Sequence, residues 1–92
     1  MFNQTTQTYF SFGNKLWREE KLNEAIAAYQ CSIKHTPNFY VSHHNLGEVL
    51  SQQGRLEEAI VAYRRAIELK PDSAATHNQL QERLANHYYA KT

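Results

Sequence analysis

Histidine, cysteine and carboxylate side chains are the groups of this 92-residue sequence that could do chemistry. His44 and Glu48 stand four positions apart, so they would share one face of a helix, and Glu82 would lie on a neighbouring helix. Because imidazole and carboxylate groups bind zinc, these three residues are a candidate metal site. They also fit ordinary polar contacts between neighbouring helices, and we therefore expect no metal.

Cys31 is the single thiol of the sequence and would be its candidate nucleophile. Its nearest charged neighbours are Lys34 and His35, which is too little to predict an activated thiolate, so we expect an inert thiol that faces solvent. The chain has no Gly-rich phosphate loop, no G-x-S-x-G, no HExxH and no CxxC sequence. We therefore predict no catalytic residues and no cofactor.

The composition is that of a small folded protein rich in helix. Hydrophobic residues make up 41% and charged residues 21%, and 10 basic residues nearly balance 9 acidic ones, which disfavours disorder and nucleic-acid binding. No apolar run approaches the roughly 18 residues that span a membrane, and the polar N-terminus does not resemble a secretory signal. We expect a single all-α domain in the cytoplasm, with no nucleic-acid or membrane partner.

The sequence repeats itself at a fixed offset, which is the step from Gly13 to Gly47. Ten positions coincide at this offset: Gly13 with Gly47, Leu16 with Leu50, Leu22 with Leu56, Glu24-Ala25-Ile26 with Glu58-Ala59-Ile60, Ala28 with Ala62, Tyr29 with Tyr63, Ile33 with Ile67 and Pro37 with Pro71. Repeats of this length indicate a stacked array of similar units.

Each unit predicts two helices, because its apolar residues recur at steps of three and four. Gly54 can take the positive φ that ends a helix, and Pro37 and Pro71 disfavour helix at the residue before them. In the first unit Glu20 and Lys21 replace this glycine, so that turn should be more strained or more open. The predicted helices cover residues at about 7–19, 23–35, 39–53, 57–69 and 73–89.

Both units resemble the tetratricopeptide repeat family, whose pattern has an aromatic residue, Leu-Gly, a large residue, and later Ala, an aromatic residue and Pro. The first unit matches with Tyr9, Phe12, Gly13, Leu16, Ala25, Tyr29 and Pro37, and the second with His43, Leu46, Gly47, Leu50, Ala59, Tyr63 and Pro71. Phe12 in place of Leu and His43 in place of an aromatic residue are departures from the pattern. The resemblance implies a right-handed solenoid of αα-hairpins with five helices.

The resemblance also divides the chain into segments of one domain. They are a leader at residues 1–6, a first repeat at 7–39, a second repeat at 40–73, and a capping helix with a tail at 74–92. A cap with a polar outer side is needed because each hairpin has an apolar face that it cannot bury alone. Leu80 and Leu84 would pack inward, and the polar side would be supplied by Gln79, Gln81, Glu82, Arg83, Asn86 and His87.

In the family the first helix of each repeat lines a concave groove, and the resemblance implies that this groove binds a peptide or a protein. Transferred position by position, its lining would be Gln7, Phe10, Asn14, Trp17, Arg18, Val41, His44, Glu48, Ser51, Gln52, Ala75, Asn78, Glu82, Ala85 and Asn86. Phe10 and Trp17 would hold an apolar anchor, while amide and imidazole groups would orient the ligand. The alternative is that some of these residues only pack against their neighbours.

The first predicted helix carries more aromatic surface than one helix pair can readily cover. It holds Phe10, Phe12, Leu16 and Trp17, with Phe2 and Tyr9 nearby. Exposed aromatic patches often mark association sites, so a homodimer is one interpretation. The other is that Tyr9, Phe12 and Leu16 are core residues and that the N-terminal leader folds over the rest.

We predict a non-catalytic protein–protein interaction module, a scaffold or adaptor that binds its partner through the concave groove. Glu48 and Glu82 would repel the acidic tails that chaperone cofactors of this family bind, so an adaptor of that kind is not expected. Two alternatives stay open. One is the N-terminal interaction region of a larger glycosyltransferase- or sulfotransferase-like enzyme, and the other is a homo-oligomerisation module that uses its aromatic N-terminal face.

Overall fold

The computed structural model describes the backbone of residues 4–90 and the side chains of residues 4–88. Within that range the chain forms five helices and no strand. The helices are α1 (Gln4–Arg18), α2 (Leu22–His35), α3 (Tyr40–Gln52), α4 (Leu56–Leu69) and α5 (Ala74–Ala90). Every helix predicted from the sequence is present, and the all-α fold is confirmed.

The first helix begins at Gln4 rather than at residue 7, and one side-chain hydrogen bond within this turn and one to the end of α2 hold it in place. Thr8 Oγ1 donates to the Gln4 carbonyl oxygen at 2.9 Å. The fully buried Thr6 shares a hydrogen bond of 2.5 Å with Thr36, at the end of α2. Residues that the sequence placed in a leader are therefore helical from Gln4 onward.

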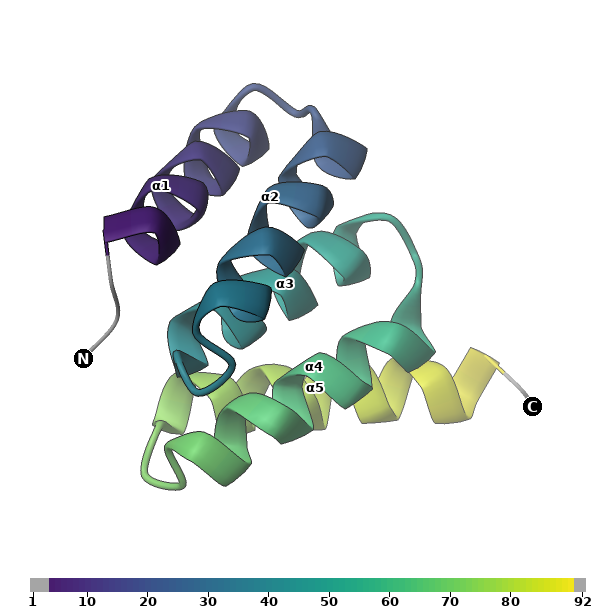
Figure 1. The fold of residues 1–92 in the computed structure, drawn as a ribbon. Helices are drawn as coiled ribbons and strands as arrows, with labels where there is room; N and C mark the ends of the chain where they lie inside the picture. The colour runs from purple at the N-terminus through teal and green to yellow at the C-terminus, as the bar shows by residue number, and fades with distance from the viewer. Residues whose placement is uncertain (1–3, 91–92) are drawn as a thin grey trace.

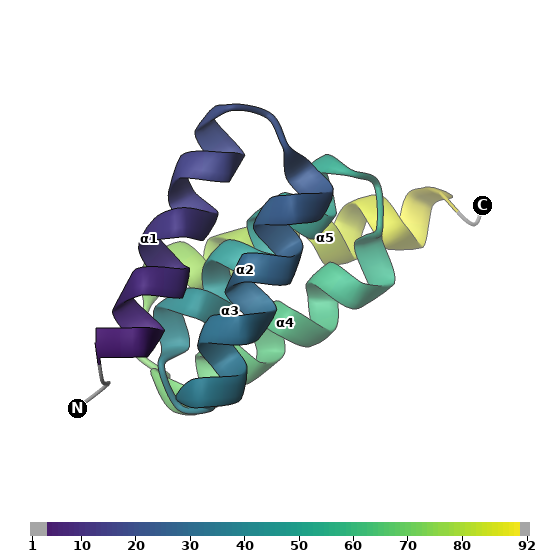
Figure 2. The ribbon, with the colours of Figure 1, turned by 45° about the horizontal axis from the view of Figure 1, so that its top comes forward.

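The helices stack in chain order, from α1 at one end to α5 at the other (Figure 1). α1 and α2 form one hairpin, α3 and α4 form the next, and α5 packs against α4 (Figure 2). The core runs between these layers. Ala25 and Tyr29 of α2, Val49 of α3, and Ala59 and Tyr63 of α4 have no exposed surface at all.

Close approach of a glycine and a tyrosine holds each hairpin together. A Cβ atom added at Gly13 would lie 2.7 Å from the Tyr29 ring, and one added at Gly47 would lie 2.8 Å from the Tyr63 ring. Both distances are well inside carbon–carbon van der Waals contact, so each ring occupies space that only glycine leaves free. The small-residue positions of the repeat are thus required by ring packing.

The two buried tyrosines also fix a polar group on the first helix of their hairpin. The Tyr29 hydroxyl donates to Asn14, and the Tyr63 hydroxyl donates to Glu48. Burial raises the pKa of Tyr29 to about 12. Burial, together with the adjacent Glu48, raises the pKa of Tyr63 above its ordinary value. Both phenols therefore stay protonated and act as hydrogen-bond donors at neutral pH.

Glu20 replaces the glycine of the turn between α1 and α2 and adopts a left-handed conformation. Its φ is 61°, and that of the corresponding Gly54 between α3 and α4 is 80°. In both turns the backbone N–H of the next residue reaches back to a carbonyl group of the preceding helix over 2.9 Å. The strained turn predicted from the sequence is confirmed, because a residue with a Cβ atom is disfavoured by about 1 kcal/mol in this conformation.

Replacing Gly13 or Gly47 with alanine will lower the free energy of unfolding by about 1–3 kcal/mol, because the new methyl group displaces the tyrosine ring. Helix propensity alone predicts the opposite, a gain of about 1 kcal/mol. Urea denaturation followed by circular dichroism measures the sign of the change in the free energy of unfolding. Ser11→Ala, at an exposed position of α1, is the control for propensity, and a stabilised Gly47→Ala variant would disprove the packing role.

Replacing Glu20 with glycine will raise the free energy of unfolding by about 0.5–1 kcal/mol, since the left-handed conformation then carries no steric penalty. Gly54→Ala is the matched opposite change. It will be destabilising through backbone conformation alone, because no atom lies within 4 Å of a Cβ added there. If the same denaturation shows that Glu20→Gly is less stable than the parent, Glu20 is not strained by its left-handed conformation.

Candidate protein-binding site

The first helices of the two hairpins and the last helix, α1, α3 and α5, carry the predicted groove residues, and we call this surface the inner face. Side-chain hydrogen bonds join its members. Trp17 Nε1 donates to Gln52 Oε1 at 2.8 Å and links α1 to α3. A hydrogen bond of 2.9 Å between His44 Nδ1 and Thr76 Oγ1 links α3 to α5. The inner face is thus one continuous surface across three helices.

Exposure separates the predicted groove residues into two sets. The exposed set is Gln7, Arg18, Gln52, Ala75, Asn78, Glu82, Ala85 and Asn86. The half-buried set is Phe10, Asn14, Trp17, Val41, His44, Glu48 and Ser51. A ligand on the inner face would therefore meet polar side chains above a partly aromatic floor.

Phe10 and Asn14 hold the inner face to the helices behind it. The Phe10 ring centroid lies 5.2 Å from that of Phe39 and 5.9 Å from that of Tyr29. Asn14 Oδ1 accepts hydrogen bonds from the Tyr29 hydroxyl at 2.5 Å and from Asn45 Nδ2 at 3.0 Å. These two residues form part of the scaffold, as the alternative interpretation of the sequence allowed.

The three candidate zinc ligands have other contacts in the structure. The His44 ring is bonded to Thr76 and lies edge-on to the Tyr63 ring, with 5.7 Å between centroids. Glu48 accepts the hydrogen bond from the Tyr63 hydroxyl. Among residues 4–88, no three His, Cys, Asp or Glu side chains lie close enough to share a metal ion. Glu82 is exposed on α5, where its carboxylate lies 3.4 Å from Arg83 Nη1.

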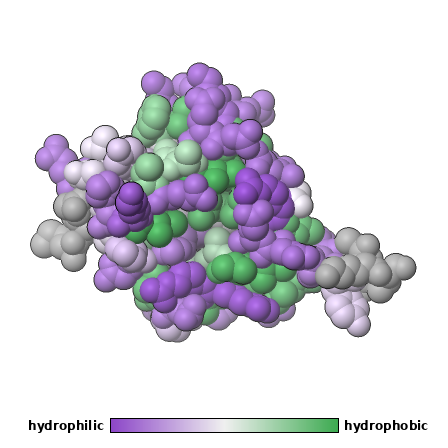
Figure 3. Space-filling view, turned by 45° about the vertical axis from the view of Figure 1, so that its right-hand side comes forward, coloured by the Kyte–Doolittle hydropathy of each residue, from purple (hydrophilic) through white to green (hydrophobic). Residues whose placement is uncertain are grey.

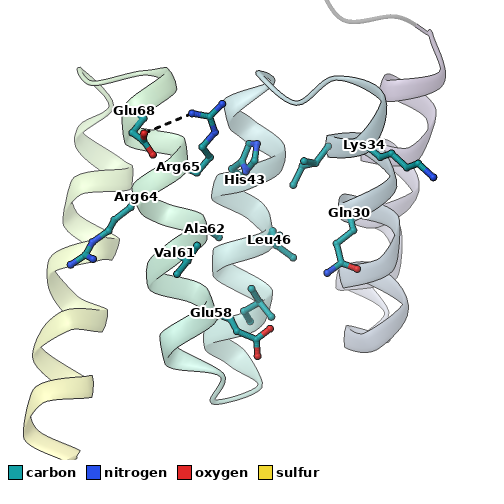
Figure 4. Close-up of a pocket in the computed structure, with 12 residues that line it drawn as sticks. Gln30, Lys34, His43, Leu46, Glu58, Val61, Ala62, Arg64, Arg65 and Glu68 are labelled. Atoms are coloured by element: carbon teal, nitrogen blue, oxygen red, sulfur yellow. Dashed lines mark ion pairs between the residues drawn. The ribbon is translucent and has the colours of Figure 1, made fainter.

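A cavity of about 860 Å³, which the sequence did not predict, lies between α2 and α4. We call it the outer cavity. Its apolar lining is Ile33 of α2, Leu46 and Leu50 of α3, and Val61 and Ala62 of α4 (Figure 4). Figure 3 shows apolar atoms in the hollow of this face, surrounded by hydrophilic residues.

One signal in the sequence could have located the outer cavity. Val61 of the second repeat is the counterpart of Ala27 of the first. It lies on the side of its helix that the repeat leaves open, and it is 67% exposed. A single exposed valine is common on protein surfaces, so this signal gains meaning only beside the other apolar residues of the cavity.

Charged residues surround the outer cavity and differ between its two ends. Lys34 of α2 and Arg65 of α4 lie at one end, and Glu58 lies at the other (Figure 4). Arg65 pairs with Glu68 at 3.8 Å, while Glu58 is bonded to Arg55 at 2.7 and 2.9 Å. We call the end with Lys34 and Arg65 the basic end and the end with Glu58 the acidic end; Glu68 offsets Arg65 at the first, and Arg55 offsets Glu58 at the second.

His43 also lines the outer cavity and closes the turn between α2 and α3. The residue is 8% exposed, and its Nε2 donates to the Pro37 carbonyl oxygen at 2.8 Å. His77 repeats this contact with the Pro71 carbonyl oxygen at 2.7 Å, but it is exposed. Burial lowers the pKa of His43 below its ordinary value of 6.5. Histidine in the aromatic position of the repeat thus supplies a hydrogen bond to the turn.

The aromatic N-terminal helix is only partly buried. Leu16 belongs to the core, with 4% of its surface exposed, whereas Phe12 is 51% exposed and Tyr9 is half-buried. The interpretation as core is right for Leu16 and wrong for Phe12, because no helix of the described chain precedes α1 and covers that side. Phe2 lies outside the described residues.

Comparison with known proteins tests the resemblance on which the inner face was predicted. A model described as a TPR repeat matches residues 47–80, and one described as a tetratricopeptide repeat matches residues 28–61. The chain belongs to the tetratricopeptide repeat family. Proteins of this family are generally non-catalytic scaffolds, and the repeats make the chain a protein-interaction module. A search of curated proteins found no match.

Two solved structures of MamA share the fold of this tetratricopeptide repeat protein. One is 22% identical in sequence, with a TM-score of 0.89, and the alignment covers 90% of this chain and 48% of that one. The other is 23% identical, with a TM-score of 0.84 and coverage of 86% and 43%. The chain thus spans less than half the length of either structure.

Lowering the pH will destabilise the protein through His43. Because its folded pKa lies below 6.5, the unfolded chain takes up the proton first, so the stabilisation is complete above pH 6.5 and is lost as the pH falls toward the folded pKa. Urea denaturation between about pH 8 and pH 5.5 will show this slope. The stability of His43→Phe, measured relative to its own value at the upper pH, will depend less steeply on pH. An unchanged dependence of stability on pH would show that His43 is not its source.

Proposed function

We propose that this non-catalytic module binds a peptide segment of a partner protein on its inner face. The observation that carries the proposal is that exposed polar side chains from α1, α3 and α5 share one surface whose floor is fixed by internal hydrogen bonds. A preorganised floor reduces the entropy lost on binding. The cytoplasm as the location, and the exclusion of nucleic acid and membrane as partners, stay predictions of the sequence.

The Trp17–Gln52 pair supports recognition of a peptide. Gln52 Oε1 accepts the indole N–H, which holds the half-buried Trp17 ring in place. The amide nitrogen of the exposed Gln52 remains as a donor for a ligand. Asn78 on α5 is exposed and carries both a donor and an acceptor. An apolar side chain on Trp17 with backbone bonds to these two amides is the binding mode that we propose.

Charge on the inner face favours one orientation of the peptide. Arg18 is exposed on α1, and Glu82 is exposed on α5 beside Arg83 at 3.4 Å; the two helices lie at opposite ends of the stack (Figure 1). The ligand would therefore carry an acidic residue near α1 and a basic residue near α5, because opposite charges steer and orient binding.

None of the helices within residues 4–90 is long and apolar enough to cross a membrane.

Selection from a displayed random peptide library will test this function. The chain is expected to enrich peptides that combine one large apolar residue with charges of both signs. A variant carrying Arg18→Glu and Asn78→Ala, both at exposed positions, will bind the enriched peptides at least about 10-fold more weakly, because one ion pair becomes repulsive and one hydrogen bond is lost.

The matched control changes two exposed residues beside the outer cavity, Gln30→Ala and Arg64→Glu, and should leave peptide binding unchanged. Fluorescence anisotropy of labelled peptides gives both affinities. Enriched peptides that bind the inner-face variant as well as the parent chain, or a library that yields no enrichment, would overturn the proposal.

A further inference from the structure

Phe12 occupies a position that the second repeat buries. The corresponding residue is Leu46, which is 9% exposed because α3 packs that side against α2 of the preceding hairpin. Phe12 lies on the same side of α1 and is 51% exposed. The outer side of α1 is thus a helix surface built to contact a second helix of a repeat, and the described chain places none there.

The outer side of α1 also carries a charge that restricts what can cover it. Lys15 stands where the second repeat has the fully buried Val49, and it forms no ion pair with the described residues. A wholly apolar partner surface would bury this ammonium group without a counter-charge, which is strongly unfavourable. The partner must therefore offer an apolar pocket for Phe12 and a carboxylate about one helical turn away.

The outer cavity of the same chain has both features. Leu46, Leu50 and Ala62 give it an apolar floor, and Glu58 lies at its acidic end, one helical turn before Ala62. We propose that Phe12 of one copy of this chain inserts into the outer cavity of a second copy. The described residues thus carry both halves of a contact, in two separate places.

Charge complementarity sets the direction of the docked helix. With Phe12 opposite Ala62 and α1 antiparallel to α4 of the other copy, Lys15 comes about 4.5 Å along the axis toward the acidic end. It then lies beside Glu58, whose carboxylate it would share with Arg55. Tyr9, whose ring is stacked on that of His35 with 5.6 Å between centroids, then lies toward the basic end. The parallel direction would instead place Lys15 against Arg65, so the antiparallel direction is favoured.

The contact is heterologous, since it joins two different surfaces of identical chains. Such contacts build open head-to-tail assemblies rather than closed dimers, because each added copy presents a free cavity and a free Phe12. One aromatic anchor over a small area makes the contact weak, so self-association appears only at high protein concentration. The inner face takes no part, and assembly would therefore place several peptide sites on one particle and increase avidity.

Sedimentation equilibrium from about 10 µM to about 1 mM tests the contact. The parent chain is expected to show an average mass that rises with concentration and passes that of a dimer. Phe12→Asp, which removes the aromatic anchor, and Val61→Arg, which blocks the cavity mouth with a cation, will each weaken association at least about 10-fold. Phe12 and Val61 are both exposed, and circular dichroism will check that each variant folds as the parent does.

The decisive sample is an equimolar mixture of the two variants. Phe12→Asp keeps an intact cavity and Val61→Arg keeps an intact Phe12, so the mixture alone will form a complex, and its mass will stop at two chains. Tyr88→Asp changes an aromatic residue that is 71% exposed on α5 and should associate like the parent.

Three results would overturn the proposal. A parent chain that stays monomeric at the highest concentration excludes self-association through this contact. Undiminished association of Val61→Arg alone would show that Phe12 pairs with itself or with another surface. A mixture that remains monomeric while the parent associates would show that Phe12 and the outer cavity are not partners. Peptide binding on the inner face is measured separately, so none of these results bears on that function.

Discussion

The close contact of each glycine with its tyrosine is the constraint on which the rest of the structure depends. Gly13 and Gly47 let the rings of Tyr29 and Tyr63 fill the space between the two helices of their hairpins. A larger residue at either glycine would move the helices apart, and the layers behind them would lose their fit. The regular spacing of the two repeats then places similar hairpins one upon the other.

The same contact explains why the inner face is both a scaffold and a candidate binding surface. The tyrosine hydroxyls reach through the hairpin and bond Asn14 and Glu48, so these two side chains are fixed from behind. Ligand contacts are left to the more exposed residues around them, such as Arg18 and Asn78. The outer cavity arises separately, because its lining comes from α2, α3 and α4 and no further helix of the described chain fills the space.

Sequence periodicity predicted the helices and the strained turn at Glu20, since both follow from local chemistry. Periodicity did not predict which of two equivalent residues, one in each repeat, would be buried by a neighbouring helix. Phe12 and Leu46 occupy equivalent positions but differ in burial, because burial depends on a neighbouring helix. Cys31 was expected to face solvent but is half-buried. The outer cavity depends on the angle between hairpins, and spacing along the chain carries no information on that angle.

Chemical-shift mapping tests the central claim, that the inner face is the ligand-binding surface, most directly. ¹⁵N-labelled Phe12→Asp protein keeps self-association out of the measurement and can be titrated with a peptide taken from the library. We predict that the perturbed amides cluster on α1, α3 and α5, around Arg18, Gln52 and Asn78. Perturbations confined to Leu46, Val61 and the other residues of the outer cavity would contradict the claim and transfer the binding site to the opposite side of the protein.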